Sequence, residues 1–188
     1  MEINAHGFFE SKDFNYHQCD KSLSEAIAKY LKEQGAQTVA DMGCGNGEYT
    51  KAIMAQNIRA YGFDGNPYTP LLTQGLGRIL DLSQPIYKPI QFEWVVSLEV
   101  GEHIPPEFEQ NFLDNITNCA VKGVILSWAI PGQGGDGHFN EQENAYIITE
   151  MNKRGFRQDR KAGAALREVS TFDWFKNTVM VFKRSKAW

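Results

Sequence analysis

The sequence predicts an α/β fold in which a doubly wound, mostly parallel sheet carries helices on both faces and ends in an antiparallel last strand. Two observations lead to this prediction. Short apolar runs alternate along the 188 residues with segments of helical periodicity, as in strands joined by crossover helices. A glycine-rich loop follows the first apolar run, where such sheets bind their ligands. Because no repeat, low-complexity tract or linker divides the chain, we expect one domain over residues 1–188.

The first half of the chain begins with a helix and continues with strands. Ser22-Leu23-Ser24-Glu25 has the form of a capping box, and apolar residues recur at helical spacing up to Gly35. A helix over residues 22–34 is therefore predicted. A second helix begins at Glu48. Apolar runs predict four strands, over residues 38–40, 60–63, 78–80 and 94–98.

The second half of the chain is expected to end in an antiparallel strand. One segment has apolar residues at the spacing of an amphipathic helix, namely Phe108, Phe112, Ile116 and Cys119. A very apolar strand follows over residues 124–128, and then a helix over about 140–153 with Gly155 as its stop. The last strand, residues 178–182, has no room for a crossover helix after it, so the final hairpin is expected to be antiparallel.

The composition excludes several classes of function. The chain is 42% hydrophobic and 22% charged, with a formal net charge of -4 and a pI near 5.6, and no stripe of Lys or Arg marks a nucleic-acid partner. Cys19, Cys44 and Cys119 have no C-x-x-C spacing, which argues against a disulfide framework and a zinc site. We therefore expect no metal and a reducing, cytoplasmic location. No apolar run approaches the length of a membrane span, and no signal peptide is recognisable.

The most informative segment is the loop Asp41-Met42-Gly43-Cys44-Gly45-Asn46-Gly47. Its glycines permit positive φ and close approach of a ligand, and the helix from Glu48 points free N–H groups at any carboxylate bound there. The dinucleotide fingerprint needs its third glycine three positions after the second. Because position 48 is Glu, binding of NAD is disfavoured. A carboxylate at the strand end also suits a cationic ligand group better than a pyrophosphate. An ordinary glycine-rich turn is the alternative.

This loop resembles motif I of the class I S-adenosylmethionine (SAM) methyltransferases. Acids that close successive predicted strands strengthen the resemblance, in the order Asp41, Asp64, Asp81 and Glu99. The resemblance implies a Rossmann-like sheet of seven strands that binds SAM and releases S-adenosylhomocysteine. The residues implied to bind the cofactor are Asp41, Gly43, Cys44, Gly45, Gly47, Asp64, Gly65, Asn66, Asp81, Leu82 and Glu99.

Three of these acids have specific expected partners. Asp64 is placed to accept hydrogen bonds from both ribose hydroxyls, with a simple Asp-Gly turn as the alternative. Asp81 is placed to accept from the adenine amino group while Leu82 packs on the ring. Glu99 is the first acid after the fourth strand and is expected near the methyl-bearing part of the cofactor.

The segment 97–105 is similar to the stretch after the fourth strand in the same superfamily, where many members carry a Glu-His-Ile or similar triplet. Glu102 and His103 are adjacent and cannot both face the same way. Either one is a candidate to line the cleft above the methyl group. A packing or loop-bracing role is the alternative for His103.

Residues 131–140 are too glycine-rich for regular structure and are expected to form the substrate loop. His138 in this loop is the candidate general base. Its alternative role is that of a surface histidine beside Asn140, which would cap the next helix. Trp128 and Gln133 lie where the superfamily commonly places acceptor-site residues.

The amino-terminal residues 1–20 are aromatic and polar by turns and are interpreted as a possible lid over the cofactor. Tyr16 and His17 are the candidate contacts from this segment. A frayed terminus without function is the alternative.

The function predicted from the sequence is SAM-dependent methyl transfer to a small-molecule acceptor. Oxygen is the favoured nucleophile because no Asn-Pro-Pro-Tyr or Asp-Pro-Pro-Tyr motif, typical of many amino-group methylators, follows the fourth strand. Three alternatives remain: N-methylation of a small molecule or protein, a SAM-binding module without catalysis, and a NAD-dependent oxidoreductase. The acceptor and the oligomeric state are not predicted.

Overall fold

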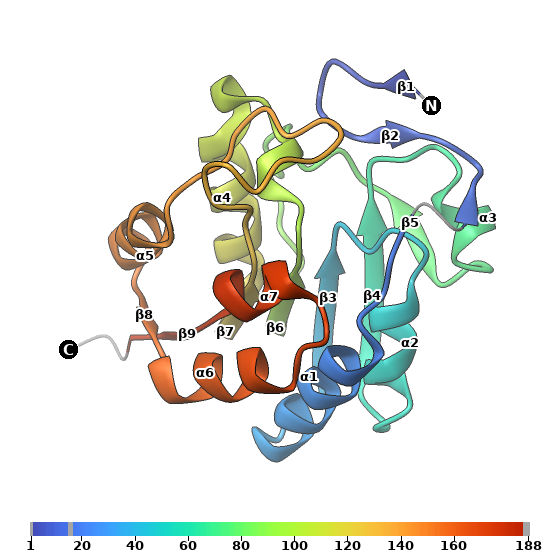
Figure 1. Cartoon of the computed structure of the whole chain (residues 1–188). Helices are drawn as coiled ribbons and strands as arrows, with labels where there is room; N and C mark the ends of the chain where they lie inside the picture. Colours follow the sequence, from blue (N-terminus) through green and yellow to red (C-terminus); the bar gives the residue numbers. More distant parts are fainter. Residues whose placement is uncertain (1, 15–16, 186–188) are drawn as a thin grey trace.

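A seven-stranded sheet runs through the computed structural model (Figure 1), which describes residues 2–14 and 17–185. From one edge to the other, the strands are β5 (Gly77–Ile79), β4 (Arg59–Asp64), β3 (Thr38–Met42), β6 (Phe92–Ser97), β7 (Ala120–Leu126), β9 (Met180–Arg184) and β8 (Phe156–Gln158). The first five are mutually parallel, whereas β9 runs antiparallel to both of its neighbours. The predicted Rossmann-like sheet with an antiparallel last strand is confirmed.

The strand order reverses at β3, which pairs in parallel with β4 on one side and with β6 on the other. At such a point the loops that follow the two central strands diverge and leave a crevice at the carboxyl end of the sheet. The four predicted acids all lie at this end. Asp41 is within β3 and Asp64 ends β4, while Asp81 and Glu99 follow β5 and β6 by two residues.

Helices cover both faces of the sheet, as predicted. One face carries α1 (Lys21–Glu33), α2 (Glu48–Met54), α6 (Arg160–Val169) and α7 (Asp173–Thr178), and the other carries α4 (Glu109–Cys119) and α5 (Asn144–Lys153). The shorter elements are β1 (Glu2–Ile3), β2 (Phe9–Glu10), α3 (Thr69–Leu72) and the 3-10 helices η2 (Gly101–His103) and η3 (Pro106–Phe108). Within the described ranges, no helix combines the length and apolar character needed to cross a membrane.

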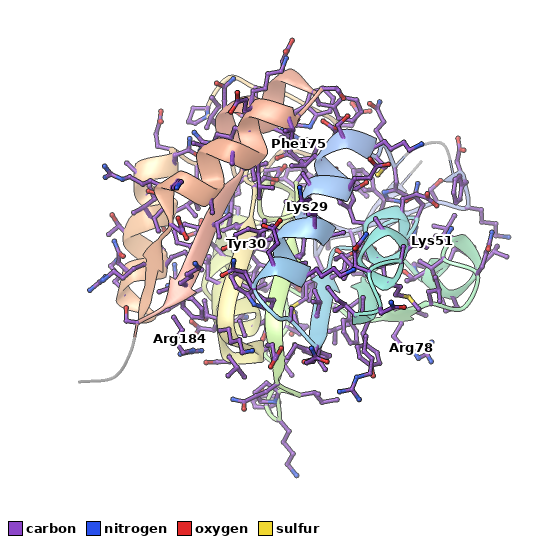
Figure 2. All side chains as sticks on the ribbon, turned by 90° about the horizontal axis from the view of Figure 1, so that it is seen from below. Lys29, Tyr30, Lys51, Arg78, Phe175 and Arg184 are labelled. Atoms are coloured by element: carbon purple, nitrogen blue, oxygen red, sulfur yellow. The ribbon has the colours of Figure 1, made fainter. Side chains whose placement is uncertain are left out.

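Successive residues of the central strands enter two different cores because side chains alternate across a strand. In β3, Val39 packs on the α1 side of the sheet and Ala40 on the α4 side, and both are fully buried. Figure 2 shows Tyr30 of α1 and Phe175 of α7, which both belong to the α1 side. Burial on both faces explains why these strands read as continuous apolar runs.

The N-cap of the first long helix is Asp20, two residues before the predicted Ser22, and the helix begins at Lys21. The Asp20 carboxylate accepts a hydrogen bond from the backbone N–H of Leu23 at 3.1 Å. It also accepts one from the Ser170 hydroxyl at 2.6 Å and two from the backbone N–H groups of residues 171–172. This buried carboxylate therefore ties α1 to the segment between α6 and α7.

We expect Asp20→Ala to lower the free energy of unfolding by at least about 3 kcal/mol. Loss of an N-cap costs about 1 kcal/mol, and each buried donor left without an acceptor costs about 1–3 kcal/mol more. Urea denaturation measures the change. Asp159→Ala is the control, since Asp159 caps α6 through one backbone hydrogen bond and otherwise pairs with the partly exposed Lys183. An Asp20→Ala loss no larger than that of the control would contradict the bracing role.

The last third of the chain departs most from the prediction. The helix predicted from residue 140 begins at Asn144, because Asn140 is buried and its side chain donates to Glu109 on α4 at 2.8 Å. Helices α6 and α7 were not predicted. The last strand begins at Met180, since Thr178 still belongs to α7, and the strand predicted over residues 124–128 spans 120–126.

Candidate functional site

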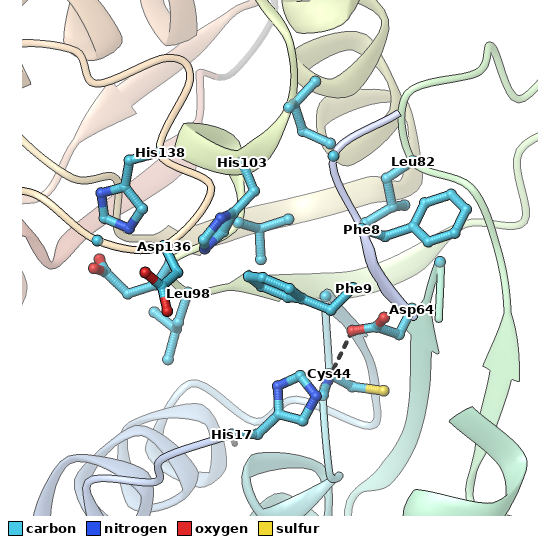
Figure 3. Close-up of a pocket in the computed structure, with 18 of the residues that line it drawn as sticks. Phe8, Phe9, His17, Cys44, Asp64, Leu82, Leu98, His103, Asp136 and His138 are labelled. Carbon is cyan, nitrogen blue, oxygen red and sulfur yellow. Dashed lines mark hydrogen bonds between the residues drawn. The ribbon is translucent and has the colours of Figure 1, made fainter. Parts of the chain in front are cut away.

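A cavity of about 680 Å³ lies at the carboxyl end of the sheet, where β3 and β6 diverge. Figure 3 shows side chains from the amino-terminal segment, the glycine-rich loop and the 131–140 loop converging on it. Most of the predicted site residues line this cavity, namely Asp41, Gly43, Cys44, Gly45, Asp64, Gly65, Asp81, Leu82, Glu99, His103, Gln133, His138 and His17. A cavity of this size is in the usual range for a small organic ligand.

The glycine-rich loop needs glycine for two separate reasons. Gly43 and Gly45 have φ of +87° and +52°, in the left-handed region that other residues rarely adopt. A Cβ on Gly43 would collide with Val100, and one on Gly45 would lie 2.8 Å from the His17 ring. Gly47 lies outside the cavity lining, where it precedes α2 with φ of +79°.

Asp41 is the buried acid beneath this loop. It is 3% exposed and accepts a hydrogen bond from the Thr50 hydroxyl on α2 at 2.6 Å. Burial raises the pKa of Asp41 to about 6, although the hydrogen bond from Thr50 lowers it. Because Asp41 is costly to ionise without a counter-charge, a cationic group bound at the loop would stabilise its carboxylate.

Asp64 holds the loop against the end of β4. Its carboxylate accepts the backbone N–H of Gly45 and that of Asn66, both at 2.9 Å, the first of them drawn in Figure 3. Each oxygen keeps a second acceptor site, so the predicted contact with two ribose hydroxyls is compatible with these bonds. Asn66 itself is buried and donates to the carbonyl of Ser11, so its side chain braces the site from outside the cavity lining.

The amino-terminal segment lies across the predicted adenine position. The His6 ring nitrogen Nδ1 is paired with Asp81, and the Phe8 ring lies against Gly65, where any Cβ would collide with it. The Phe9 ring meets His103 edge-on, with 5.0 Å between ring centroids. His17 covers Gly45. Tyr16, the other predicted contact, is outside the described residues.

Glu99 also lines the cavity, and its backbone has the unusual φ of +52°. Its backbone N–H donates to the Ser127 hydroxyl at 2.8 Å, and its side chain accepts from Gln133 Nε2 at 2.7 Å. Gln133 lines the cavity as well, and this hydrogen bond ties the 131–140 loop to Glu99. Burial raises the pKa of Glu99.

The 3-10 helix η2 separates the two adjacent candidates Glu102 and His103. Glu102 is fully buried outside the cavity lining, and burial, together with repulsion from Glu99, raises its pKa well above the ordinary value. His103 lines the cavity, with Nδ1 3.0 Å from the Gly137 carbonyl oxygen. Burial and the proximity of His138 lower the pKa of His103 to about 4.

His138 also lines the cavity, with Nδ1 3.2 Å from a carboxylate oxygen of Glu141. The ring lies 4.9 Å from that of His103, centroid to centroid (Figure 3). The alternative of a histidine beside a helix cap is wrong, since Asn140 does not cap α5. Glu141 holds the ring and also accepts from the backbone N–H groups of Gly132 and Gly134, both at 2.7 Å.

Trp128 was predicted to contact the acceptor, and this prediction is wrong. Its side chain is fully buried in the core on the α4 side, against Gly101 and Phe112, and its indole N–H donates to the carbonyl of Asn140 at 2.6 Å. The sequence pattern of an apolar residue at the end of a strand is the same whether its side chain faces a core or a cavity.

Several residues of the site were not predicted as contacts: His6, Phe8, Phe9, Leu98, Val100 and Asp136. The aromatic and polar character of the amino terminus was the signal for three of them. Their pairing with Asp81, Gly65 and His103 depends on how the segment folds back, which sequence spacing does not encode.

No protein-family model and no curated protein sequence matches the chain. Several solved structures, in contrast, are similar to the chain. Magnesium protoporphyrin IX methyltransferase from Synechocystis PCC 6803 with bound SAM has a TM-score of 0.66 at 19% identity over 96% of this chain and 95% of that one. The sugar N-methyltransferase KedS8 from Streptoalloteichus sp ATCC 53650 has a TM-score of 0.68 at 13% identity, covering 93% and 89%. The 1,6-didemethyltoxoflavin-N1-methyltransferase of Burkholderia thailandensis gives 0.59 at 17%, covering 89% and 80%. At these identities the likeness establishes the fold.

Proposed function

We propose that this protein is a SAM-dependent methyltransferase that acts on an oxygen nucleophile of a small molecule. The observation that carries the proposal is the buried acid Asp41 beneath the glycine-rich loop at the switch point of the sheet, with further acids at successive strand ends. SAM-dependent methyltransferases with solved structures share this fold. The single domain over residues 1–188 remains part of the proposal.

The cofactor would lie from the glycine-rich loop to Asp81. In this arrangement the methionine ammonium lies near Asp41, the ribose hydroxyls bind Asp64, and the adenine amino group binds Asp81 beside Leu82. Because His6 is paired with Asp81, the amino-terminal segment must move before the adenine can bind. It is then free to close over the ligand, in the role of a lid.

The acceptor would bind on the other side, between Glu99 and His138. In the transfer, an oxygen lone pair of the acceptor attacks the methyl carbon, the C–S bond breaks, and its electron pair stays on sulfur as S-adenosylhomocysteine forms. The acceptor proton passes to His138 Nε2, because Nδ1 is directed at Glu141. The protein's further contribution is alignment of the two reactants.

The net charge supports a small-molecule acceptor, and the cysteines support a location inside the cell. The net charge of -4 disfavours a nucleic-acid surface. The three cysteines are unpaired, as expected in a reducing compartment such as the cytoplasm.

We expect Asp64→Ala to weaken SAM binding about tenfold to a hundredfold, since charge-assisted hydrogen bonds contribute about 1.5–3 kcal/mol. Calorimetry with the purified chain measures the affinity. Asp114→Ala, at a half-exposed carboxylate on α4 that pairs with Arg154, is the control for loss of a charge. Unchanged affinity in Asp64→Ala would reduce Asp64 to a turn residue.

The proposed function is tested by incubating the chain with methyl-labelled SAM and a metabolite extract, followed by mass spectrometry. We expect label on a small-molecule hydroxyl, and stabilisation by S-adenosylhomocysteine but not by NAD in thermal unfolding. Label on an amino group, or only on nucleic acid, would contradict the acceptor assignment. Binding of SAM with no transfer to any acceptor would favour a non-catalytic module.

A further inference from the structure

Three side chains, two that line the proposed acceptor side of the cavity and one buried behind it, form a cluster that methyl transfer by alignment alone does not require. Glu102, His103 and His138 each place one potential ligand atom within 4.8 Å of the others. They come from η2 and from the 131–140 loop, which are far apart in sequence. Glu99 stands beside the cluster, close enough to Glu102 for the two carboxyl groups to influence each other electrostatically.

Both histidines of the cluster are held in the manner of metal ligands. His103 Nδ1 faces the Gly137 carbonyl oxygen at 3.0 Å, and His138 Nδ1 faces Glu141 at 3.2 Å. Each Nδ1–H then donates to an oxygen, which leaves the lone pair of Nε2 available. Metal-binding histidines are typically oriented by such a carbonyl or carboxylate.

The carboxylates of the cluster are short of partners. Both oxygens of Glu102 and Oε1 of Glu99 are buried, and none of them has a partner at ordinary hydrogen-bond geometry among the described residues. No Lys or Arg of the described chain lines the cavity to balance them. Two neighbouring buried carboxyl groups require a proton or a cation between them.

We propose that Glu102, His103 and His138 bind a divalent first-row transition-metal cation, with Glu99 as the adjacent carboxylate. Mixed imidazole and carboxylate ligands favour such ions over Ca²⁺, which prefers oxygen alone. Bonds of about 2.1 Å would bring these ligand atoms closer together than the 4.8 Å within which they now lie. No cysteine takes part, so the cysteine spacing that argues against a zinc site does not bear on this one.

This inference rests on the proposed function and refines it. His103 and His138 line the cavity, so open coordination positions of the cation would face the acceptor. An acceptor hydroxyl bound there becomes more acidic. With the cation bound, the Nε2 lone pair of His138 is used for coordination, and the proton passes to Glu99. The methyl group then moves to the oxygen, and the C–S electron pair stays on sulfur.

The test is titration of the chelator-treated full chain with Co²⁺, followed by visible absorption and calorimetry. We expect one equivalent of Co²⁺ to bind with new d–d absorption bands. Glu102→Gln and His138→Asn should each weaken this binding by at least about tenfold. His6→Gln is the matched control, because it removes the other histidine–carboxylate pair of the cavity and should leave Co²⁺ binding unchanged. Thermal stabilisation by S-adenosylhomocysteine checks that each variant is folded.

Two outcomes would overturn the metal site: no Co²⁺ binding to the parent chain, or equal binding by the parent and both cluster variants. Methyl transfer at full rate in the presence of a chelator would overturn its role in the reaction and leave the proposed methyltransferase function intact. Stoichiometric Co²⁺ binding without SAM binding or transfer would sustain the metal site and contradict the proposed function.

Discussion

Replacement of His138 by asparagine is expected to lower kcat by about 10² to 10⁴ while changing the Kd for SAM by less than about threefold. A positioned base contributes a rate factor of this size, and in the cation-bound arrangement the same substitution removes a ligand of the ion that acidifies the acceptor. The asparagine keeps a polar side chain of similar reach but has no basic nitrogen. His138 lies against Glu141 and the ring of His103, on the side of the cavity proposed for the acceptor, so the proposed cofactor contacts remain. Steady-state kinetics and calorimetry on the same preparation separate the two effects.

Phe139→Ala is the matched control for this experiment, since Phe139 lies in the same loop and the residue is 54% exposed. It should retain the parental kcat. If His138→Asn also keeps near-parental turnover, the histidine is a brace of the loop and serves the reaction neither as its base nor as a ligand of a required cation.

Gly45→Val is expected to abolish detectable SAM binding without unfolding the protein. The backbone there has φ of +52° and donates its N–H to Asp64 at 2.9 Å, and a Cβ would press on the His17 ring. A branched side chain would also occupy the space through which a ligand approaches the loop. Calorimetry measures the binding and circular dichroism the fold.

Gly35→Val is the control because it carries the same kind of backbone strain away from the site. Gly35 has φ of +66° at the end of α1, and a Cβ there meets nothing within 4 Å. We expect this variant to be destabilised yet to bind SAM with parental affinity. Parental affinity in Gly45→Val as well would remove the glycine-rich loop from the cofactor site.

The sequence alone determined the parts of this protein that depend on local pattern. The apolar runs at 38–40, 94–98 and 124–128 were read correctly as buried parallel strands, since a strand covered on both faces carries mostly apolar residues. Acids placed directly after those runs had to meet at one edge of the sheet, because parallel strands share their carboxyl ends. Asp41, Asp64, Asp81 and Glu99 accordingly line one cavity.

Local pattern failed where a partner distant in the chain decides the outcome. Asp20 caps α1 in place of Ser22, because the segment at 170–172 supplies three further donors to its carboxylate. Asn140 is drawn into the core by Glu109, which delays the start of α5. The capping preference of a side chain is worth about 1 kcal/mol, and several tertiary hydrogen bonds outweigh it.

Only the tertiary structure decided which residues of the site meet. In the folded protein Trp128 is buried and His6 is paired with Asp81. Glu102 and His103 of η2 lie close to His138, whose ring is held by Glu141. Spacing along the chain fixes the side of a helix or strand on which a residue lies. Spacing carries no information on how a glycine-rich loop or an amino-terminal segment folds back onto the protein, because that depends on many weak tertiary contacts.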